Sequence, residues 1–279
     1  MKRFDTDLHT HTYYSDGAIS PKVLVGFAKK KKIKNLALTD HNSVRGVEEA
    51  MKEGKKLKIN IIPGVEVQFK GGEMLGYFID YKNKGLHRDL KKAHKLKMDI
   101  KIKAKLMALH KFEPRISLSK LIKKFPYAKD NYYSYHIDRF LREECDYTEE
   151  QVDEIWMKTP IQYKKDRVLS PIQAIRLIKK YKGVAVWSHP WLSKKIFTEK
   201  NLKKCIKAGL KGLEFDNGDR NMWGRDPKFA RKLKRLAKKY NLILTKGSDF
   251  HGYNTLKGKG HEIGNTLCSH KVVKQLESR

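Results

Sequence analysis

The stretch DLHTHTYYSDG, residues 7–17, places four side chains of metal-binding types within ten positions. They are Asp7, His9, His11 and Asp16. Alternate residues of a β-strand point to the same face, so the imidazoles of His9 and His11 can both reach one ion. A complete metal site needs more ligands, which other parts of the chain must supply.

Short apolar runs that predict strands alternate with amphipathic stretches that predict helices. Proline follows Ser20, Ser170 and Asp226, where it marks three predicted helix starts. This alternation is typical of a parallel sheet or barrel, so we predict an α/β fold. The seven predicted strands are residues 4–10, 35–40, 59–67, 73–79, 183–189, 209–216 and 242–249.

One region, residues 85–170, has no clear strand and is predicted to be helical. We interpret it as a helical insertion subdomain between the fourth and fifth strands. The barrel domain then consists of residues 1–84 and 171–279. A chain of 279 residues with 39% hydrophobic residues is large enough to bury such a core.

Several predicted strands end in residues that can bind metal. The carboxyl ends of parallel barrel strands face one mouth, so residues far apart in the sequence can converge there. Imidazoles with carboxylates suit Zn, Mn or Fe, and carboxylates can bridge two ions. Besides His9 and His11, the residues at these ends are Asp40, His41, Glu66, His189, Asp249 and His251.

A single histidine is more often a hydrogen-bonded core or surface residue than a metal ligand. Five histidines that all lie at the carboxyl ends of predicted strands, with carboxylates beside them, instead favour a metal site. Other histidines lie in helical or tail contexts, where the structural interpretation is preferred: His87, His94, His110, His261 and His270.

The chain is strongly basic, with 62 Lys and Arg against 31 Asp and Glu and a net charge of +31. Solvated lysine-rich helix faces explain part of this excess, but the scarcity of acid favours a phosphate-bearing substrate. Three widely spaced cysteines argue against a disulfide framework and fit a reducing cytoplasm. Neither a signal peptide nor a transmembrane run is visible, so we expect a cytoplasmic protein without a membrane partner. The sequence leaves the oligomeric state open.

Five motifs resemble, in their order along the chain, those of the PHP (polymerase and histidinol phosphatase) family. They are DLHTHTYYSDG, LTDHN, IPGVEV, SHP and GSDFHG. The resemblance covers nearly the whole chain and implies a distorted (β/α)7 barrel of the PHP type with a di- or trinuclear metal site. The phrases ALTDHNSVRGVEEA and LGYFID, with the insertion, are similar to the stand-alone phosphoesterase branch. That branch is associated with nucleoside 3′,5′-bisphosphates and with 5′–3′ exonuclease trimming of short oligonucleotides.

The resemblance also implies a ligand set for two or three divalent ions, which would be Mn, Zn or Fe, with Mg as an alternative. One ion takes His9, His11, Glu66 and Asp249; Glu66 bridges to a second ion that takes His189; a third ion is held by Asp16, His41 and His251. The insertion implies a further ligand, for which His136 in SYHIDRFL is the candidate and a surface histidine the alternative. In the family an Arg-Pro pair precedes this histidine, whereas this sequence has Ser134 and Tyr135 there. The phosphate contact that the family's arginine implies is therefore left open.

Our mechanistic hypothesis is a metal-activated hydroxide that attacks phosphorus in line while the ions stabilise the charged oxygens. Three divalent ions and the carboxylates of Asp16, Glu66 and Asp249 would leave a charge of about +3, which attracts phosphate. A metal-bound water, or His251 or His189, would protonate the leaving group. The predicted catalytic residues are therefore Asp249, His251, His189 and Glu66.

Four further residues are candidates for binding substrate. Arg139, Arg220 and Lys246 could contact phosphate, with solvated surface charge as the alternative. Trp191 could stack on a base, or simply pack at the barrel rim. Glu214, at the end of the sixth predicted strand, is either support for a ligand histidine or a helix-dipole partner.

We therefore predict an enzyme, a metal-dependent phosphoesterase acting on nucleotides or short oligonucleotides. Nucleic acid would be a substrate rather than a stable partner. One alternative is a small-molecule phosphatase of the histidinol-phosphate type. The other is a nucleic-acid-binding protein whose metal site is structural.

Overall fold

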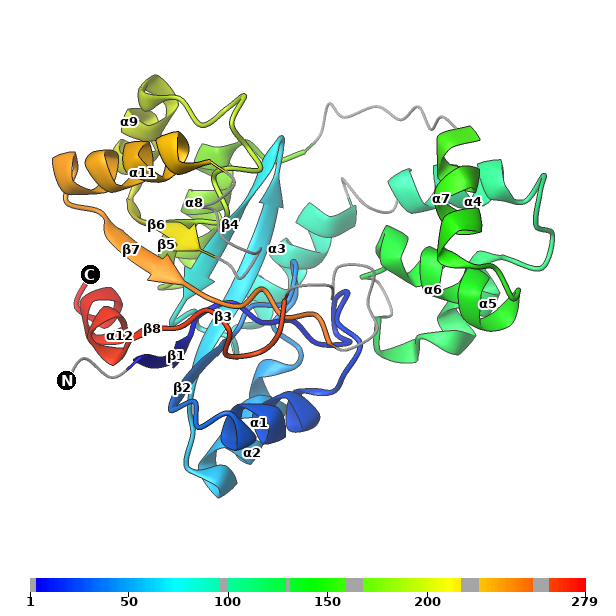
Figure 1. Cartoon of the computed structure of the whole chain (residues 1–279), viewed down its shortest axis with the longest axis horizontal. Coiled ribbons are helices and arrows are strands. Elements are labelled where there is room, and N and C mark those ends of the chain that lie inside the picture. The colour runs from blue at the N-terminus through cyan, green and yellow to red at the C-terminus, as the bar shows by residue number, and fades with distance from the viewer. Residues whose placement is uncertain (1–3, 96–99, 129–130, 159–167, 217–225, 253–260) are drawn as a thin grey trace.

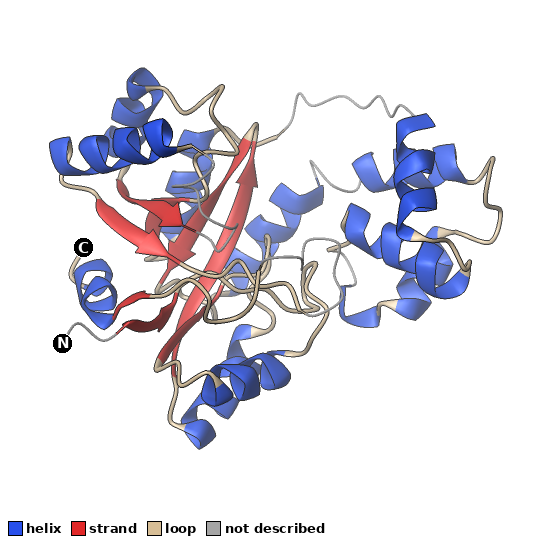
Figure 2. Cartoon of the chain, in the orientation of Figure 1, coloured by secondary structure: helices blue, strands red, loops and turns tan. Residues whose placement is uncertain are grey.

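The computed structural model describes residues 4–95, 100–128, 131–158, 168–216, 226–252 and 261–279. Within them, a curved sheet has the strand order β7-β6-β5-β4-β3-β2-β1-β8, and helices surround it (Figure 2). The strands are β1 (Phe4–Asp7), β2 (Asn35–Leu38), β3 (Asn60–Phe69), β4 (Gly72–Tyr77), β5 (Val184–Trp187), β6 (Leu210–Asp216), β7 (Ile243–Lys246) and β8 (Cys268–Ser269).

The sheet closes on itself where the segments that follow β1 and β7 meet. The backbone N–H of Leu8 donates to the carbonyl of Lys246 at 3.2 Å, and that of Asp249 donates to His9 at 2.8 Å. A side chain at Gly247 would place its Cβ only 2.3 Å from the backbone nitrogen of His9, so this close approach requires glycine. The predicted distorted α/β barrel is confirmed.

Strand direction differs from the prediction at one strand. β1, β2 and β3 pair in parallel, as do β5, β6 and β7, but β4 is antiparallel to both of its neighbours. The expectation of a uniformly parallel barrel was therefore wrong at β4. The short strand β8, antiparallel to β1, was not predicted.

Alternating side chains give the sheet two apolar faces. On β2, Ala37 packs with residues of the other strands, whereas Leu36 and Leu38 belong to the larger core that the outer helices cover. Helix α12 adds Val273 and Leu276 to the cluster of Ala37. The outer helices are α1 (Pro21–Lys30), α2 (Val47–Leu57), α8 (Pro171–Lys180), α9 (Glu199–Ala208) and α11 (Pro227–Lys239), with α12 (His270–Glu277) at the chain end.

The three predicted helix starts are confirmed, and each has a side-chain cap. Ser20, Ser170 and Asp226 accept hydrogen bonds from the backbone of the first turn, and proline follows each of them. These caps satisfy backbone N–H groups that the helix itself leaves unpaired.

The predicted insertion is helical in its described residues, and most of it lies to one side of the barrel (Figure 1). Its helices α4–α7 form a separate apolar cluster that includes Leu109, Leu121 and Leu141. Helix α3, by contrast, packs Leu86 and Leu90 into the main core. The division of the chain at residues 84 and 170 stays a prediction. The bounds are α3 (Lys84–His94), α4 (Ile100–Leu109), α5 (Leu118–Lys124), a 3-10 turn (Pro126–Ala128), α6 (Ser134–Glu144) and α7 (Glu149–Lys158).

Cys145, Cys205 and Cys268 are buried and form no disulfide. Among the described helices, none has both the length and the apolar character that crossing a membrane would require.

Candidate metal centre

His9 and His11 follow β1 and point into one buried site. The Nε2 atom of His9 lies 3.2 Å from Glu66 Oε2 and 3.3 Å from Asp249 Oδ1. The Nε2 atom of His11 lies 3.4 Å and 3.3 Å from the same two oxygens. Residues that follow β1 and β7, together with β3, thus place two imidazoles and two carboxylates around one point.

A second group lies on the other side of His11. His251 Nε2 is 3.3 Å from Asp16 Oδ1, and His41 Nε2 is 3.6 Å from Asp16 Oδ2. The rings of His11 and His251 stack with their centroids 4.1 Å apart. Ligand atoms of these four residues all lie within 4.8 Å of one another, a spacing that suits a metal ion.

A third group centres on Glu66 and contains a residue that we did not predict. His189 Nε2 lies 3.1 Å from Glu66 Oε1 and 3.2 Å from Glu73 Oε2. His41 Nδ1 lies 3.0 Å from Glu66 Oε2 and 3.7 Å from Glu73 Oε1. Glu73 stands near the beginning of β4, and because β4 is antiparallel this end faces the mouth. We had searched only the carboxyl ends of strands.

Glu214 on β6 holds two of the histidines in place. Its Oε1 lies 2.8 Å from Nδ1 of His9, and its Oε2 accepts the backbone N–H of His189 at 2.8 Å. Ser188 donates its hydroxyl to Glu66 Oε1 at 2.6 Å. A carboxylate that accepts the second N–H of a histidine orients that ring toward a metal. Of the two interpretations of Glu214, the structure supports the contact with a histidine.

Asp40, which we had considered as a ligand, instead organises the loop that carries Asp16. Its carboxylate accepts hydrogen bonds from the Thr12 backbone N–H at 2.7 Å and from the Thr12 hydroxyl at 2.6 Å. The Ser15 hydroxyl donates a third hydrogen bond, also at 2.6 Å. Asp40 belongs to none of the three described ligand groups.

The charges in the site favour ionised carboxylates. Burial alone would raise the pKa of Glu66, but His9 and His41 outweigh it and hold that pKa well below its usual value. Burial would lower the pKa of His9, yet Glu214, Glu66 and Asp249 hold it well above the ordinary value. Burial, with His251 and His41 nearby, lowers the pKa of His11 to about 3, which keeps this imidazole neutral.

The residues present fit bound metal ions. Both ring nitrogens of His11 are buried and make no ordinary hydrogen bond within the described part of the chain. Burying a polar nitrogen without a hydrogen bond costs folding free energy. A neutral imidazole has one nitrogen lone pair, and a bound metal ion would use the lone pair that makes no hydrogen bond here. His189 and Asp249 adopt positive φ angles of 24° and 52°, a backbone strain that is common at functional sites.

His136 is not part of these groups. It is buried on α6, and its Nδ1 accepts the backbone N–H of Tyr133 at 2.9 Å. The neutral ring therefore carries its proton on Nε2, the tautomer that donates a hydrogen bond rather than binding a metal. Burial lowers the pKa of His136 to about 4. Its role as a ligand stays a prediction.

Three of the four predicted substrate-binding residues lie in the described part of the chain, where each contacts other side chains. Arg139 is paired with Glu143 at 2.6 Å, and Lys246 Nζ lies 3.3 Å from Asp216. The Trp191 ring centroid is 6.1 Å from that of His189, which places it at the edge of the site. Arg220 lies outside the described residues. Their roles stay predictions.

The fold and the site together define a distorted α/β barrel with a buried histidine and carboxylate cluster suited to metal ions. A model of the PHP domain matches residues 7–170, which is more than half of the chain. The chain therefore belongs to the PHP domain family.

Relatives in this family differ in their named activities. The chain is 41% identical over 63 residues to the 5′-3′ exoribonuclease Rnm of Escherichia coli, a match that spans 22% of each protein. It is 35% identical over 89 residues to a 3′,5′-nucleoside bisphosphate phosphatase of Chromobacterium violaceum, spanning 30% of this chain and 31% of that one. It is 23% identical over 270 residues to a phosphoribosyl 1,2-cyclic phosphate 1,2-diphosphodiesterase of Eggerthella lenta, spanning 88% and 94%.

The first two of these matches span less than a third of the relative's length. A solved structure from Bifidobacterium adolescentis, assigned as a metal-dependent phosphoesterase, has a TM-score of 0.78 with this chain. It shares 22% sequence identity, and the alignment covers 98% of this chain and 95% of that one. This likeness shows the fold.

Proposed function

We propose that this protein is a metal-dependent phosphoesterase that hydrolyses phosphate esters of nucleotides or short oligonucleotides. The observation that carries the proposal is the set of three adjoining ligand groups at the barrel mouth, which share His11, His41 and Glu66. Membership of the PHP domain family supports it. The named activities of the exoribonuclease and of the bisphosphate phosphatase support the substrate class.

The proposed ligand set follows the three groups. His9, His11, Glu66 and Asp249 would hold one ion. Glu66, Glu73 and His189 would hold a second, beside His41. Asp16, His41 and His251 would hold a third, beside His11. Bound divalent ions would supply positive charge against phosphate oxygens and a water of lowered pKa. With Glu73 included, four carboxylates against three divalent ions would leave a charge of about +2.

The protein's own residues prepare this chemistry. Glu214 fixes the ring of His9, and the Ser188 hydroxyl fixes one oxygen of Glu66. The neutral His11 presents a lone pair rather than a proton. A metal-bound water, or alternatively His251 or His189, would protonate the leaving oxygen.

Phosphate or nucleotide release by the metal-loaded protein tests the proposal. The substrates are adenosine 3′,5′-bisphosphate, a 5′-phosphorylated RNA trinucleotide, a ribose 1,2-cyclic phosphate and histidinol phosphate, each with Mn²⁺ and with a chelator. Metal-dependent release from either of the first two substrates is expected. Release from the cyclic ester alone, or from histidinol phosphate alone, would replace the nucleotide substrate class with that compound's class. No release despite bound metal would favour a nucleic-acid-binding protein.

The Asp249→Ala variant tests the site itself. Asp249 contacts both His9 and His11, so its loss removes one carboxylate from the first group. We expect turnover to fall to a small fraction of the wild-type value, while the circular dichroism spectrum remains that of the folded protein. Asp153→Asn, at an exposed position on α7, is the control. Near-normal turnover by a folded Asp249→Ala variant contradicts the assignment.

A further inference from the structure

Asn131, in the segment before helix α6, joins two loops that each carry a candidate metal ligand. Its amide nitrogen donates to the backbone carbonyl of His41 at 2.9 Å and to that of Tyr14 at 2.8 Å. His41 is itself a candidate ligand, and Tyr14 lies two residues before another, Asp16. One side chain of the insertion thus connects the loop after β1 with the loop after β2.

The orientation of this amide follows from its surroundings. Asn131 is buried, with only 4% of its surface exposed. Its NH2 group has two hydrogens, and each has a carbonyl oxygen as acceptor, whereas a flipped amide would set its own oxygen against both carbonyls. The hydroxyl of Tyr133, which is also buried, lies 3.1 Å from the His41 carbonyl oxygen and 3.2 Å from Asn131 Oδ1. The insertion therefore supplies two buried polar side chains to the mouth of the barrel.

Other contacts attach the insertion to the mouth and so place Asn131. Arg45, in the loop after β2, donates to the carbonyl oxygen of Tyr127 at 2.8 Å. The ring of Tyr127 stacks on that of Tyr13, with the centroids 4.2 Å apart. Because Tyr127 lies four residues before Asn131, these contacts hold the chain close to the two loops.

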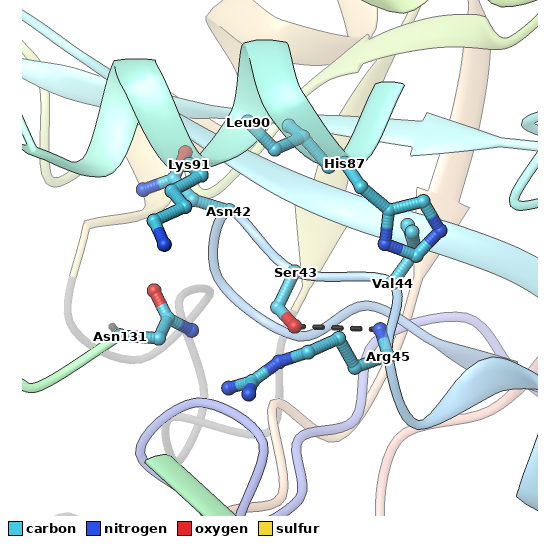
Figure 3. Close-up of a pocket in the computed structure, with 8 residues that line it drawn as sticks. All are labelled: Asn42, Ser43, Val44, Arg45, His87, Leu90, Lys91 and Asn131. Atoms are coloured by element: carbon cyan, nitrogen blue, oxygen red, sulfur yellow. Dashed lines mark hydrogen bonds between the residues drawn. The ribbon is translucent and has the colours of Figure 1, made fainter. Parts of the chain in front are cut away.

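Packing alone does not fix the loop after β2. Figure 3 shows a space between this loop, helix α3 and Asn131, and its volume is about 130 Å³. Residues 42–45 of the loop line this cavity. Side chains that border a cavity lack packing contacts on that side, so the loop has room to shift. The hydrogen bonds at the His41 carbonyl therefore matter more for its position than they would in a tightly packed loop.

The three ligand groups differ in their dependence on these loops. Only the group of Asp16, His41 and His251, which also includes His11, takes ligands from both of the loops that Asn131 joins. In this group His41 Nε2 lies 3.6 Å from Asp16 Oδ2, so a relative shift of the two loops would separate the ligands directly. The hydrogen bonds described above for the other two groups come from the barrel strands and their ends.

We infer that Asn131 and Tyr133 are positioning residues, which keep Asp16 and His41 at the separation that the third ion requires. The insertion thereby controls the occupancy of this ion, through hydrogen bonds to the backbone of the ligand loops. This inference rests on the ligand set of the proposed function and adds a role for the insertion. Because coupling between binding events is reciprocal, an ion between Asp16 and His41 also tightens the docking of the insertion.

Titration of the metal-free protein with Mn²⁺, with free Mn²⁺ measured by electron paramagnetic resonance, tests this inference without depending on turnover. We expect one of three binding steps to weaken at least about tenfold in Asn131→Leu, and less in Tyr133→Phe, which leaves the amide in place. Asp16→Asn identifies this step, because it removes a ligand of the third ion. The other two steps should keep their affinities, which also shows that the variants are folded.

Two controls remove the same groups elsewhere. Asn201→Leu, on α9, deletes an amide that donates to the Ile196 carbonyl at 2.9 Å. Tyr147→Phe deletes a hydroxyl from a ring that packs in the insertion's own apolar cluster. Both should bind three ions as the wild type does. Adding Asn131→Leu to Asp16→Asn should leave the two remaining affinities unchanged, because the site on which Asn131 acts is already lost.

The outcomes separate this inference from the proposed function. An unchanged third step in Asn131→Leu overturns the inference, whether or not the protein hydrolyses a substrate. A weakening of all three steps also overturns it, since it points to a general effect on the barrel. A wild type that binds fewer than three ions overturns it as well, and the substrate panel then decides the proposed function by itself. Weakening of the third step alone supports the inference, even if no substrate of that panel is hydrolysed.

Discussion

At the scale of single residues, Glu214 shows how a side chain outside the ligand groups can control them. It contacts the ring of His9 and the backbone of His189, so it links the histidines of two ligand groups. We predict that Glu214→Gln lowers metal affinity about 10–100-fold, because the amide cannot replace both acceptor oxygens. Titration of the metal-free protein with Mn²⁺, followed by metal analysis, measures the effect.

Glu48→Gln is the control for this variant, because Glu48 is exposed and pairs only with Lys52 in the described chain. It should bind metal as the wild type does. Unchanged affinity in Glu214→Gln would mean that the His9 ring is oriented without Glu214.

Asp40 should affect stability more than chemistry. Its two oxygens accept three hydrogen bonds from Thr12 and Ser15. Asn has only one acceptor oxygen, and its NH2 group would face hydrogen-bond donors instead of accepting from them. We predict that Asp40→Asn lowers the free energy of unfolding by about 1–3 kcal/mol, measured by urea denaturation of the metal-free protein. Asp153→Asn should have almost no effect. A variant of normal stability that has lost metal binding would return Asp40 to the ligands.

Residue types and positions at strand ends were enough to predict much of the cluster. His9 and His11 stand out because they are two residues apart in a predicted strand. His41, His189 and His251 stand out because each follows an apolar run. Glu73 could not be found in this way, because it begins its strand instead of ending it. The tautomer of His136 depends on a hydrogen bond to Tyr133 that only the folded helix terminus creates.

At the scale of elements, the direction of β4 was readable and was missed. Only Lys70 and Gly71 separate β3 from β4, whereas a parallel connection needs a dozen residues or more. Gly71 also has a φ of 87°, which suits a tight hairpin. The KGG sequence at residues 70–72 therefore favours an antiparallel pair, and with it the position of Glu73.

The helices of the insertion contain a lysine in an unusual environment. Lys105 on α4 has its ammonium 3.4 Å from the centre of the Trp156 ring, and the Trp156 indole donates to Asp138 at 2.7 Å. Burial lowers the pKa of Lys105 from 10.5 to about 8. Between these two pH values the unfolded chain holds a proton that the folded chain has released, so this group makes stability rise with pH.

We therefore predict that Lys105→Met removes this rise between pH 8 and pH 10.5. The variant's stability relative to the wild type should be highest at pH 7 and should decline as the pH rises through the window. Urea unfolding followed by far-UV circular dichroism at several pH values measures it. Lys103→Met, at an exposed position on the same helix, is the control and should show no such trend. A parallel pH profile for Lys105→Met and the wild type contradicts the prediction.

At the scale of the whole molecule, the fold class followed from the alternation of strands and helices, but the relation of the insertion to the barrel did not. Its contact with the mouth depends on Asn131 and Arg45, whose partners are backbone carbonyls. Backbone acceptors have no signature in the sequence, because every residue carries one. The contact between the insertion and the barrel mouth could therefore not be predicted.

The net charge of +31 should appear in the salt dependence of catalysis. From 50 to 200 mM KCl we expect KM to rise, and to rise more for adenosine 3′,5′-bisphosphate than for adenosine 5′-monophosphate, because the bisphosphate carries more negative charge for the salt to screen. The comparison of adenosine 3′,5′-bisphosphate with adenosine 5′-monophosphate measures this difference. An equal rise for the two substrates would contradict this expectation.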